Sequence, residues 1–363
     1  MTGRIVVYGF NNSAGGTRTA FLAFTEFLVR AGFRVGTIVA SDRRDCVQPG
    51  LEFVNYIPCS GRGLRARKVV AVARAILRSR AFRPDVFVSV GMSNVPNVIS
   101  RCLGGATYRI CQDVTFGLDP NGSKITRTRA SFDAIAPQAP RMERDLRRRG
   151  YAGPGLRWLP CLTAPPVPGV LATPGATRPY RLGYFGRVDR HKGVELLIEA
   201  LASEPSTRDL RLDVWGDADG SVVRNAARRF GIEERARNCG RYPAGAEGAQ
   251  LMASYDALAL TSLDNEGLPL ILLEAMAYGL PILVTNVASI PDCAEGNPGA
   301  VLIPPTLEGV MDGLRQVKSR LEAGSFSAAA IRRFYDENFS AELMERRWQE
   351  CLREPEEFFS VVE

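Results

Sequence analysis

The sequence predicts an α/β protein with two domains, each a doubly wound parallel sheet, and three observations lead to this fold class. The chain has 363 residues, which is more than one hydrophobic core usually holds. Short β-branched runs alternate with longer helical patterns along the chain, and this alternation is typical of parallel sheets. Six prolines fall within residues 160–179, between two such series, and indicate an interdomain connection.

The first series of strand-like runs defines an N-terminal domain, predicted over residues 1–165. The runs are residues 4–9, 33–40, 84–90, 108–114 and 132–137. After the first run come Gly15 and Gly16, then a helix from about Thr19. Glycine allows close backbone approach and a helix N-terminus attracts anions. The loop lacks the G-x-G-x-x-G dinucleotide fingerprint, which disfavours an NAD(P) dehydrogenase.

The second series defines a C-terminal domain, predicted over residues 180–335 after a linker at 166–179. The runs are residues 181–187, 210–216, 256–262, 281–286 and 299–304. A polar amphipathic helix, predicted over residues 336–363, could pack on either domain, including back on the N-terminal one. Ligands of doubly wound sheets bind beyond the carboxyl ends of the strands, so we expect the site in a cleft between the domains.

Composition narrows the class of protein. With 45% hydrophobic and 23% charged residues, the chain is globular rather than disordered or fibrous. No secretory signal is recognised and no run reaches the ~18 apolar residues of a membrane span, so we expect a cytoplasmic protein or one bound to the inner face of the cell membrane. Eight scattered cysteines without a C-x-x-C pair, and one histidine, disfavour a zinc cluster and indicate reduced thiols.

Charge is divided unevenly between the two halves. Residues 1–165 carry 25 Lys and Arg against 10 Asp and Glu, a net of +15, whereas the remainder carries a net of −8. An arginine-rich proteome would add basic residues throughout a chain. The asymmetry therefore favours an anionic partner of the N-terminal half.

A basic helix is predicted within residues 61–85, where eight basic residues precede Asp85. On a helical wheel, one face collects arginines and the opposite face apolar residues: Arg67, Arg74 and Arg78 against Val69, Val72 and Ile76. The basic face is either simply solvated or a surface for anionic lipid headgroups or an anionic acceptor. Nucleic acid is disfavoured because no aromatic platform or known binding motif accompanies the arginines.

The segment GYFGRVDRHKGVELLIEAL, residues 183–201, places two cations after a strand. Arg187 and Lys192 follow the strand that ends at Gly186 and precede an apolar helix. Such a pair would suit a diphosphate, because arginine offers a planar fork and lysine a point charge. A solvated basic loop is the alternative. His191 is expected to face solvent rather than to act as a catalyst.

The segment LDNEGLPLILLEAMAYGLP, residues 263–281, contains two glutamates. Glu266 falls in a loop after a strand, beside free backbone N–H groups at Gly267 and Leu268, and Glu274 lies inside the apolar helix that follows. A glutamate there is costly unless it is paired or bonded to hydroxyls, and carboxylate oxygens fit the vicinal hydroxyls of a sugar. Taken alone, the segment also fits two unrelated glutamates at chance spacing.

Together, GRVDRHKG, VWGDADG and EGLPLILLEAMAYGLPILVTNVASIPD resemble the C-terminal half of family-4-type retaining GT-B glycosyltransferases, strongly over residues 180–305. The resemblance implies that Arg187 and Lys192 neutralise the donor diphosphate. It also implies that Glu274 binds the nucleotide ribose and Glu266 the transferred sugar. Further donor contacts are implied for the amides of Gly267 and Leu268 and, from the N-terminal domain, for Gly16.

The implied activity is a retaining, metal-independent hexosyl-type transfer from a nucleotide-diphosphate sugar to an acceptor hydroxyl, without a cofactor. The acceptor, bound by the N-terminal domain, would be a sugar, a lipid-linked molecule or a small molecule. One position departs from the family pattern. Gln112, followed by Asp113, stands where the family commonly carries a histidine. Glutamine can hydrogen-bond a sugar hydroxyl but cannot titrate, so both residues are assigned to the acceptor or sugar site by position only.

Two other functions remain open at this point. A nucleotide-sugar 2-epimerase would share the fold but needs further acid and base residues, which a single histidine makes scarce. A sugar-nucleotide-binding pseudoenzyme or assembly subunit would fit the loss of histidine at position 112. No motif identifies the sugar, the base or the acceptor, because loop shapes decide them.

Overall fold

The chain divides into two compact units in the computed structural model, one of residues 1–164 with 341–363 and the other of residues 165–340. The structure describes residues 3–10, 16–44, 49–113, 122–153, 155–176, 178–216, 219–264 and 266–360. The N-terminal loop up to Gly15 and the side chain of Asp113 lie outside this description. In the part of the chain it covers, no helix is both long and apolar enough to cross a membrane.

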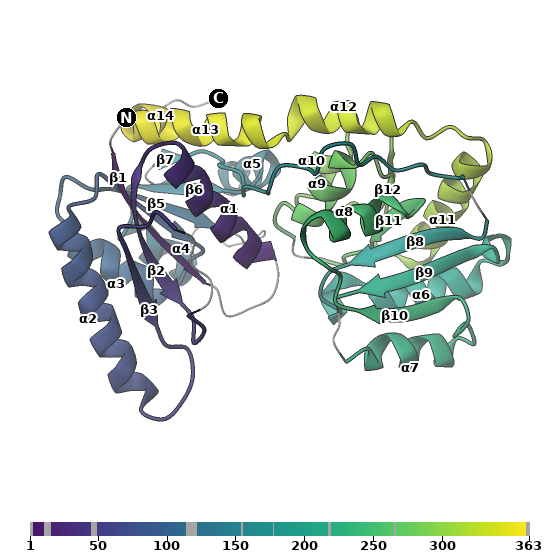
Figure 1. The fold of residues 1–363 in the computed structure, drawn as a ribbon, viewed down its shortest axis with the longest axis horizontal. Coiled ribbons are helices and arrows are strands. Elements are labelled where there is room, and N and C mark those ends of the chain that lie inside the picture. The colour runs from purple at the N-terminus through teal and green to yellow at the C-terminus, as the bar shows by residue number, and fades with distance from the viewer. Residues whose placement is uncertain are drawn as a thin grey trace. The chain divides into compact units, whose positions relative to one another are not determined.

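The first unit contains one seven-stranded parallel sheet in the order β3-β2-β1-β4-β5-β6-β7. The strands are β1 Arg4–Phe10, β2 Arg34–Ala40, β3 Phe53–Ile57, β4 Val86–Val90, β5 Tyr108–Asp113, β6 Ala134–Pro137 and β7 Gly155–Leu156. The helices between them are α1 Gly16–Arg30, α2 Leu64–Phe82, α3 Asn94–Cys102, α4 Ser123–Arg129 and α5 Pro140–Arg148. Helices α2 and α3 cover one face of the sheet and α1 the other (Figure 1). Alternate β1 residues such as Val6 and Tyr8 enter the core beneath α2 and α3.

The second unit contains one six-stranded parallel sheet in the order β10-β9-β8-β11-β12-β13. Its strands are β8 Tyr180–Phe185, β9 Leu210–Trp215, β10 Ala236–Gly240, β11 Ala257–Leu260, β12 Ile282–Thr285 and β13 Ala300–Ile303. Its helices are η1 Arg190–Lys192, α6 Val194–Ser203, η2 Pro205–Thr207, α7 Ser221–Arg229, α8 Gly245–Ala253, α9 Leu270–Ala277, α10 Pro291–Ala294, α11 Leu307–Glu322 and α12 Ala328–Asn338. Helices α6, α7 and α11 form one layer, and α8, α9 and α12 lie on the other face (Figure 1). The predicted pair of doubly wound parallel sheets is confirmed.

The chain passes between the units after residue 164 and again after residue 340. The proline-rich segment expected to be a linker is bound to the second unit, where the Ala172 N–H donates to the Tyr278 carbonyl (2.8 Å) and the Gly175 N–H to Asp256 Oδ1 (2.7 Å). Helices α13 Ala341–Arg353 and α14 Pro355–Ser360 belong to the first unit. Trp348 of α13 is fully buried there, with its ring centroid 4.3 Å from that of Phe24.

Helix α2 corrects one expectation from the sequence. Val72 and Ile76 pack against the core as expected, but the side chain of Val69 is 68% exposed. The buried positions of α2 are Ala75 and Ser79, so the packed stripe runs back through residues 72 and 68 and leaves Val69 about 100° to one side. Arg67, Arg74 and Arg78 are exposed.

Candidate active site

The two predicted donor segments follow neighbouring strands, because β8 and β11 are adjacent and parallel. Their carboxyl ends therefore meet at one edge of the second sheet. Two hydrogen bonds join the loops that leave this edge. Thr261 Oγ1 donates to the Gly193 carbonyl (2.9 Å), and the Leu263 N–H donates to the His191 carbonyl (2.8 Å).

Gly193 allows this close approach of the two loops. It has a left-handed backbone with φ of 64°, and a Cβ at this position would lie 2.0 Å from the carbonyl oxygen of Thr261. No other residue type would fit without moving one of the loops. The Lys-Gly pair in the sequence motif is thus explained by backbone packing at residue 193 and by charge at residue 192.

Lys192 and Glu266 form an ion pair between the two loops. Ser262 Oγ also donates to Glu266 Oε1, at 2.5 Å. Glu266 is buried, and 19% of the Lys192 side chain is exposed. Both contacts are made to Oε1, so within the described residues Glu266 Oε2 and the remaining Nζ hydrogens of Lys192 are available to a ligand.

Arg187 lies at the end of β8 with most of its side chain exposed. Its one described ion pair is a long one, with Nη1 3.6 Å from Asp189 Oδ2. Tyr184 Oη donates to the Arg187 carbonyl at 2.7 Å and so fixes the backbone from which the arginine projects. His191 is exposed and contacts Asp264 at 2.8 Å, which agrees with a solvent-facing position.

The start of α9 provides hydrogen-bond donors beside Glu266. Among the described residues, the N–H groups of Gly267 and Leu268 have no acceptor. Helix α9 then begins at Leu270, with Pro269 as its N-cap. Unpaired N–H groups at a helix start attract anionic oxygens. Lys192, Arg187 and these amides thus supply positive charge and donors from adjoining loops.

Glu274 lies one turn into α9, half-buried, and no described residue pairs with its carboxylate. Burial raises the pKa of this carboxyl to about 7. A carboxyl held without a partner is poised to accept hydrogen bonds from hydroxyls of a ligand. Among the described residues, no group of three or more His, Cys, Asp or Glu side chains could hold a metal ion.

Tyr242 was not singled out from the sequence but belongs with Glu274. It follows β10, packs edge-on against Phe185 with ring centroids 5.5 Å apart, and is 38% exposed. Burial first, and then the Glu274 carboxylate, raise the pKa of Tyr242 to about 12, so the two side chains are close enough to interact. The sequence signal that could have found Tyr242 was a large aromatic residue just after the carboxyl end of a strand.

The remaining predicted residues lie in the first unit. Gly16 is exposed and is the first residue of α1. Gln112 is buried, and its Nε2 donates to the carbonyls of Leu159 (2.9 Å) and Pro160 (3.0 Å), so its amide secures the chain that follows β7. Asp113 ends β5. A direct acceptor contact by Gln112 or Asp113 stays a prediction.

Comparison with known proteins shows what the second unit is similar to. Residues 179–318 match the family model of glycosyl transferases group 1. Over 148 residues, the chain is 28% identical to the D-inositol 3-phosphate glycosyltransferase of Corynebacterium aurimucosum, and the aligned region covers 38% of this chain and 34% of that relative. The chain thus matches only about a third of the length of this curated relative.

Solved structures match over nearly the whole chain. Sucrose-phosphate synthase from Thermosynechococcus elongatus superposes with a TM-score of 0.77 at 16% identity, covering 97% of this chain and 98% of that one. HepE from Anabaena, in complex with UDP-glucose, has a TM-score of 0.76 at 15% identity, covering 97% and 99%. At these identities the similarity concerns the fold, and it shows that the chain has the GT-B fold.

Proposed function

The second unit carries the glycosyl transferase group 1 region, and from this premise we propose that the chain is a retaining, metal-independent glycosyltransferase with a nucleotide-diphosphate-sugar donor. The observation that carries the proposal is a grouping at one sheet edge. It joins the Lys192–Glu266 pair to the amides of Gly267 and Leu268 and the Glu274 carboxylate, which have no partner among the described residues. The proposal includes a cytoplasmic location.

Each group has a distinct role in this proposal. Lys192, Arg187 and the amides of Gly267 and Leu268 stabilise the diphosphate as it departs, because fixed cations and donors gain most from charge that develops in the transition state. Glu266 accepts from hydroxyls of the transferred sugar, and the Lys192 ammonium holds it ready. Glu274 accepts from the ribose hydroxyls, with Tyr242 beside it. Gly16 approaches the diphosphate from the first unit, which binds the acceptor.

The proposed transfer retains the anomeric configuration. The acceptor oxygen forms a bond to the anomeric carbon on the face from which the bond to the phosphate oxygen breaks, and the acceptor's proton passes to the leaving phosphate. Arg187 and Lys192 supply the positive charge at the diphosphate that a divalent ion supplies in other enzymes.

A donor panel tests this function. UDP-, GDP-, ADP- and dTDP-sugars are compared by thermal shift, with UDP-glucose first because HepE binds it. The stabilising donor is then incubated with the protein, and nucleotide release is followed with and without candidate acceptors. Conversion of the donor sugar without any acceptor would identify an epimerase. Tight binding with no release under any condition would identify the pseudoenzyme.

Ionisation of the Glu274 carboxyl is expected to have opposite effects on donor binding and on the stability of the fold. Its pKa is about 7 in the folded chain against an ordinary 4.5, so its ionisation destabilises the fold as pH rises through that window. We expect Glu274→Met to raise the stability of the ligand-free protein by about 3 kcal/mol at pH 8 and to change it little at pH 4.5. Calorimetry at both pH values measures the difference.

Donor affinity is expected to increase as the Glu274 carboxyl ionises, whereas the stability of the protein decreases. The carboxylate accepts more strongly than the neutral acid, so wild-type donor affinity should rise several-fold between pH 6 and pH 8. Glu274→Gln should bind about 10-fold more weakly and lose this pH dependence. Glu199→Gln, a half-buried glutamate on α6 in the other helix layer, is the matched control. Equal pH profiles for wild type and Glu274→Gln would contradict the role.

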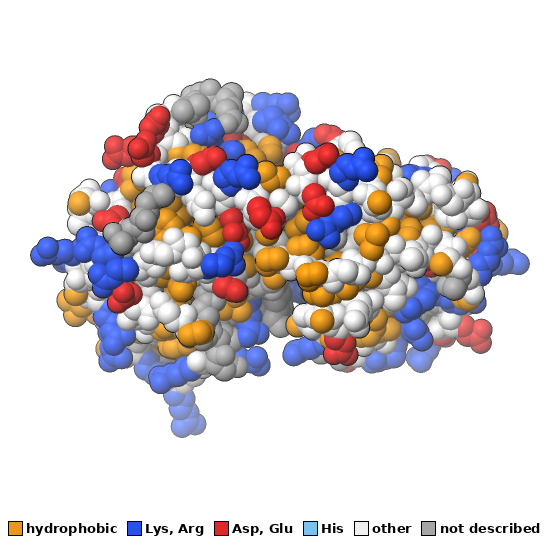
Figure 2. Space-filling view, turned by 45° about the horizontal axis from the view of Figure 1, so that its top comes forward, with side chains coloured by type: hydrophobic (Ala, Val, Ile, Leu, Met, Phe, Trp, Pro, Cys, Tyr) orange, Lys and Arg blue, Asp and Glu red, His pale blue; other side chains and the backbone are white. Residues whose placement is uncertain are grey.

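Association with an anionic membrane surface is a further part of the proposal, supported by α2. This helix has a second, exposed apolar row at helical spacing, formed by Ala66, Val70, Ala73 and Leu77. Val70 is 58% and Leu77 69% exposed, and Arg67, Arg74 and Arg78 each follow a member of this row. Basic side chains also spread over the face drawn in Figure 2, so charge alone does not distinguish a surface. A row of arginines beside exposed apolar side chains fits anionic headgroups above acyl chains.

Vesicle sedimentation tests the α2 surface. We expect binding to vesicles with 30% phosphatidylglycerol at low salt, little binding to phosphatidylcholine alone, and at least a fivefold loss for Val70→Asp/Leu77→Asp, because each charge must enter the interface. Val98→Asp places the same charge at an exposed valine of α3 and is the matched control. If both variants bound the vesicles equally well, α2 would not be part of the membrane contact.

A further inference from the structure

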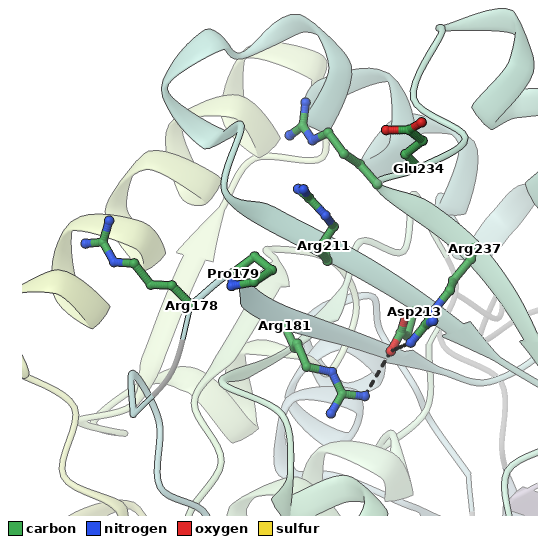
Figure 3. Close-up of a pocket in the computed structure, with 8 residues that line it drawn as sticks. Arg178, Pro179, Arg181, Arg211, Asp213, Glu234 and Arg237 are labelled. Atoms are coloured by element: carbon green, nitrogen blue, oxygen red, sulfur yellow. Dashed lines mark hydrogen bonds and ion pairs between the residues drawn. The ribbon is translucent and has the colours of Figure 1, made fainter.

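A pocket of about 400 Å³ lies near the amino ends of strands β8, β9 and β10 of the second sheet, opposite the carboxyl ends that carry the donor site (Figure 3). Five arginines line it: Arg178, Arg181, Arg211, Arg235 and Arg237. The register of the parallel strands sets Arg181 opposite Arg211, and Arg237 opposite Asp213, near the amino ends of these strands. Parallel strands of six residues separate this edge from the carboxyl edge by about 20 Å, so the pocket is distinct from the donor site.

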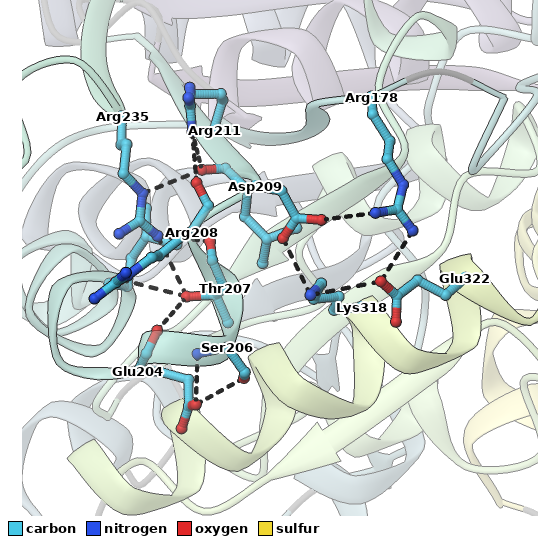
Figure 4. Close-up of polar contacts among 12 residues, drawn as sticks. Arg178, Glu204, Ser206, Thr207, Arg208, Asp209, Arg211, Arg235, Lys318 and Glu322 are labelled. Atoms are coloured by element: carbon cyan, nitrogen blue, oxygen red, sulfur yellow. Dashed lines mark hydrogen bonds and ion pairs between the residues drawn. The ribbon is translucent and has the colours of Figure 1, made fainter.

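Three of the five arginines form ion pairs with carboxylates. Arg181 and Arg237 share the buried Asp213, at 3.0 Å and 2.6 Å. Arg178 pairs with Glu322 at 2.9 Å and with Asp209 at 3.5 Å. Lys318 also binds Asp209, at 3.3 Å, so that carboxylate is already shared (Figure 4).

Arg211 and Arg235 differ from these three. Arg211 Nη1 donates to the Arg208 carbonyl (2.9 Å) and Arg235 Nη2 to the Thr207 carbonyl (2.7 Å), as Figure 4 shows. In the described part of the chain, neither guanidinium has an ion pair with a carboxylate. Burial first, and then the positive charges of Arg211 and Arg208, lower the pKa of Arg235, while Asp209 acts in the opposite direction. Glu234 also lines the pocket, but among the described residues it has no ion pair with either guanidinium. The positive charge of Arg211 and Arg235 is therefore not neutralised by a contacting acid.

The size of the site favours a small anion over a protein segment. A cavity of this volume is within the range of small-molecule sites. Guanidinium groups match phosphate oxygens with paired N–H donors. In Figure 3, the side chains of Arg181 and Arg237 converge on Asp213, and Arg211 lies above them with its guanidinium pointing the other way.

We propose that this pocket is a second anion site, separate from the donor site, which binds a phosphate-bearing small molecule through Arg211 and Arg235. Arg181 and Arg237 complete the walls and are held in place by Asp213. The site does not depend on the glycosyltransferase proposal.

Calorimetric titration with inorganic pyrophosphate tests the site. The donor site would also take this ligand, so wild type is compared with Arg187→Gln/Lys192→Met, which removes the donor cations, and with Arg211→Gln/Arg235→Gln. We expect Arg187→Gln/Lys192→Met to retain submillimolar pyrophosphate binding at the arginine pocket. In Arg211→Gln/Arg235→Gln, binding at this pocket should weaken at least 10-fold. Pyrophosphate binding that disappears in the first variant would overturn the proposal, since all of it would then belong to the donor site.

Two further experiments control for misfolding of the variants and for the chemical class of the ligand. Arg211→Lys keeps the charge and loses the fork, so it should bind within about threefold to tenfold of wild type. Arg211→Gln alone serves if the double variant does not fold. A hexaglutamate peptide provides carboxylates without phosphate. Tighter binding of this peptide than of pyrophosphate would overturn the small-anion proposal in favour of an acidic protein partner.

Discussion

Lys192→Met and Glu266→Gln are each expected to lower the rate of glycosyl transfer about 100- to 1,000-fold, because each removes a preorganised charge from the transition state. The two side chains contact each other, on loops that Gly193 and Thr261 hold together. In the proposed mechanism, the lysine faces the departing phosphate and the carboxylate faces the sugar. Initial rates at saturating donor measure the effect, and donor Kd is measured separately so that binding and turnover are not confused.

The double variant Lys192→Met/Glu266→Gln separates catalysis from structure. Either single change leaves a buried charge unpaired, which costs about 3–5 kcal/mol, and the double change removes both charges. Stability should therefore recover in the double variant, whereas turnover should not. Lys318→Met is the matched control, since Lys318 is an ion-paired lysine of the same unit with 20% of its side chain exposed. If turnover recovered together with stability, the pair would be structural only.

Trp348→Ala is expected to destabilise the first unit by about 3–5 kcal/mol and to leave the second unit unchanged. The indole is fully buried against Phe24, and its Nε1 donates to the Pro160 carbonyl at 2.8 Å. Removing it leaves a cavity between α1 and α13 and takes one of two side-chain donors from the Pro160 carbonyl, which keeps its hydrogen bond from Gln112 Nε2. Differential scanning calorimetry should show one transition moving to lower temperature, and nucleotide should still raise the transition of the second unit.

Trp348→Phe provides the graded control for this prediction. Phenylalanine keeps most of the ring packing and loses only the hydrogen bond, so the expected cost is about 1 kcal/mol. Loss of stability in the second unit instead of the first would contradict the placement of α13. Unchanged transitions in both units would show that the tail contributes nothing to folding.

The sequence was sufficient for those features that depend on neighbours along the chain. Short β-branched runs separated by helical patterns identify the strands, since a parallel strand buried on both faces must be apolar and its connection must be a helix. The order of Arg187, Lys192, Glu266 and Glu274 also predicted the donor segments, because these residues follow two strands and strands of such sheets carry ligands at their carboxyl ends. Their roles stay a prediction.

The wheel analysis of α2 was less accurate. It placed Val69 with Val72 and Ile76, although the buried stripe passes one position earlier, through residue 68. A helical pattern gives the direction of a buried face within about one residue, and the sheet beneath decides which side chains it covers.

Contacts between distant residues were decided by tertiary structure alone. The Lys192–Glu266 pair spans 74 residues and exists because β8 and β11 are neighbours in the sheet, which the order of strands along the chain does not reveal. Gln112 could be compared with a family histidine, but only the fold shows its amide bonded to the chain after β7. The same holds for the five arginines that line one pocket, which come from three strands and from the segments that lead into β8 and β10. Sequence determined the elements and their chemistry by local periodicity, and the pairing of strands, which is non-local, determined which charges meet.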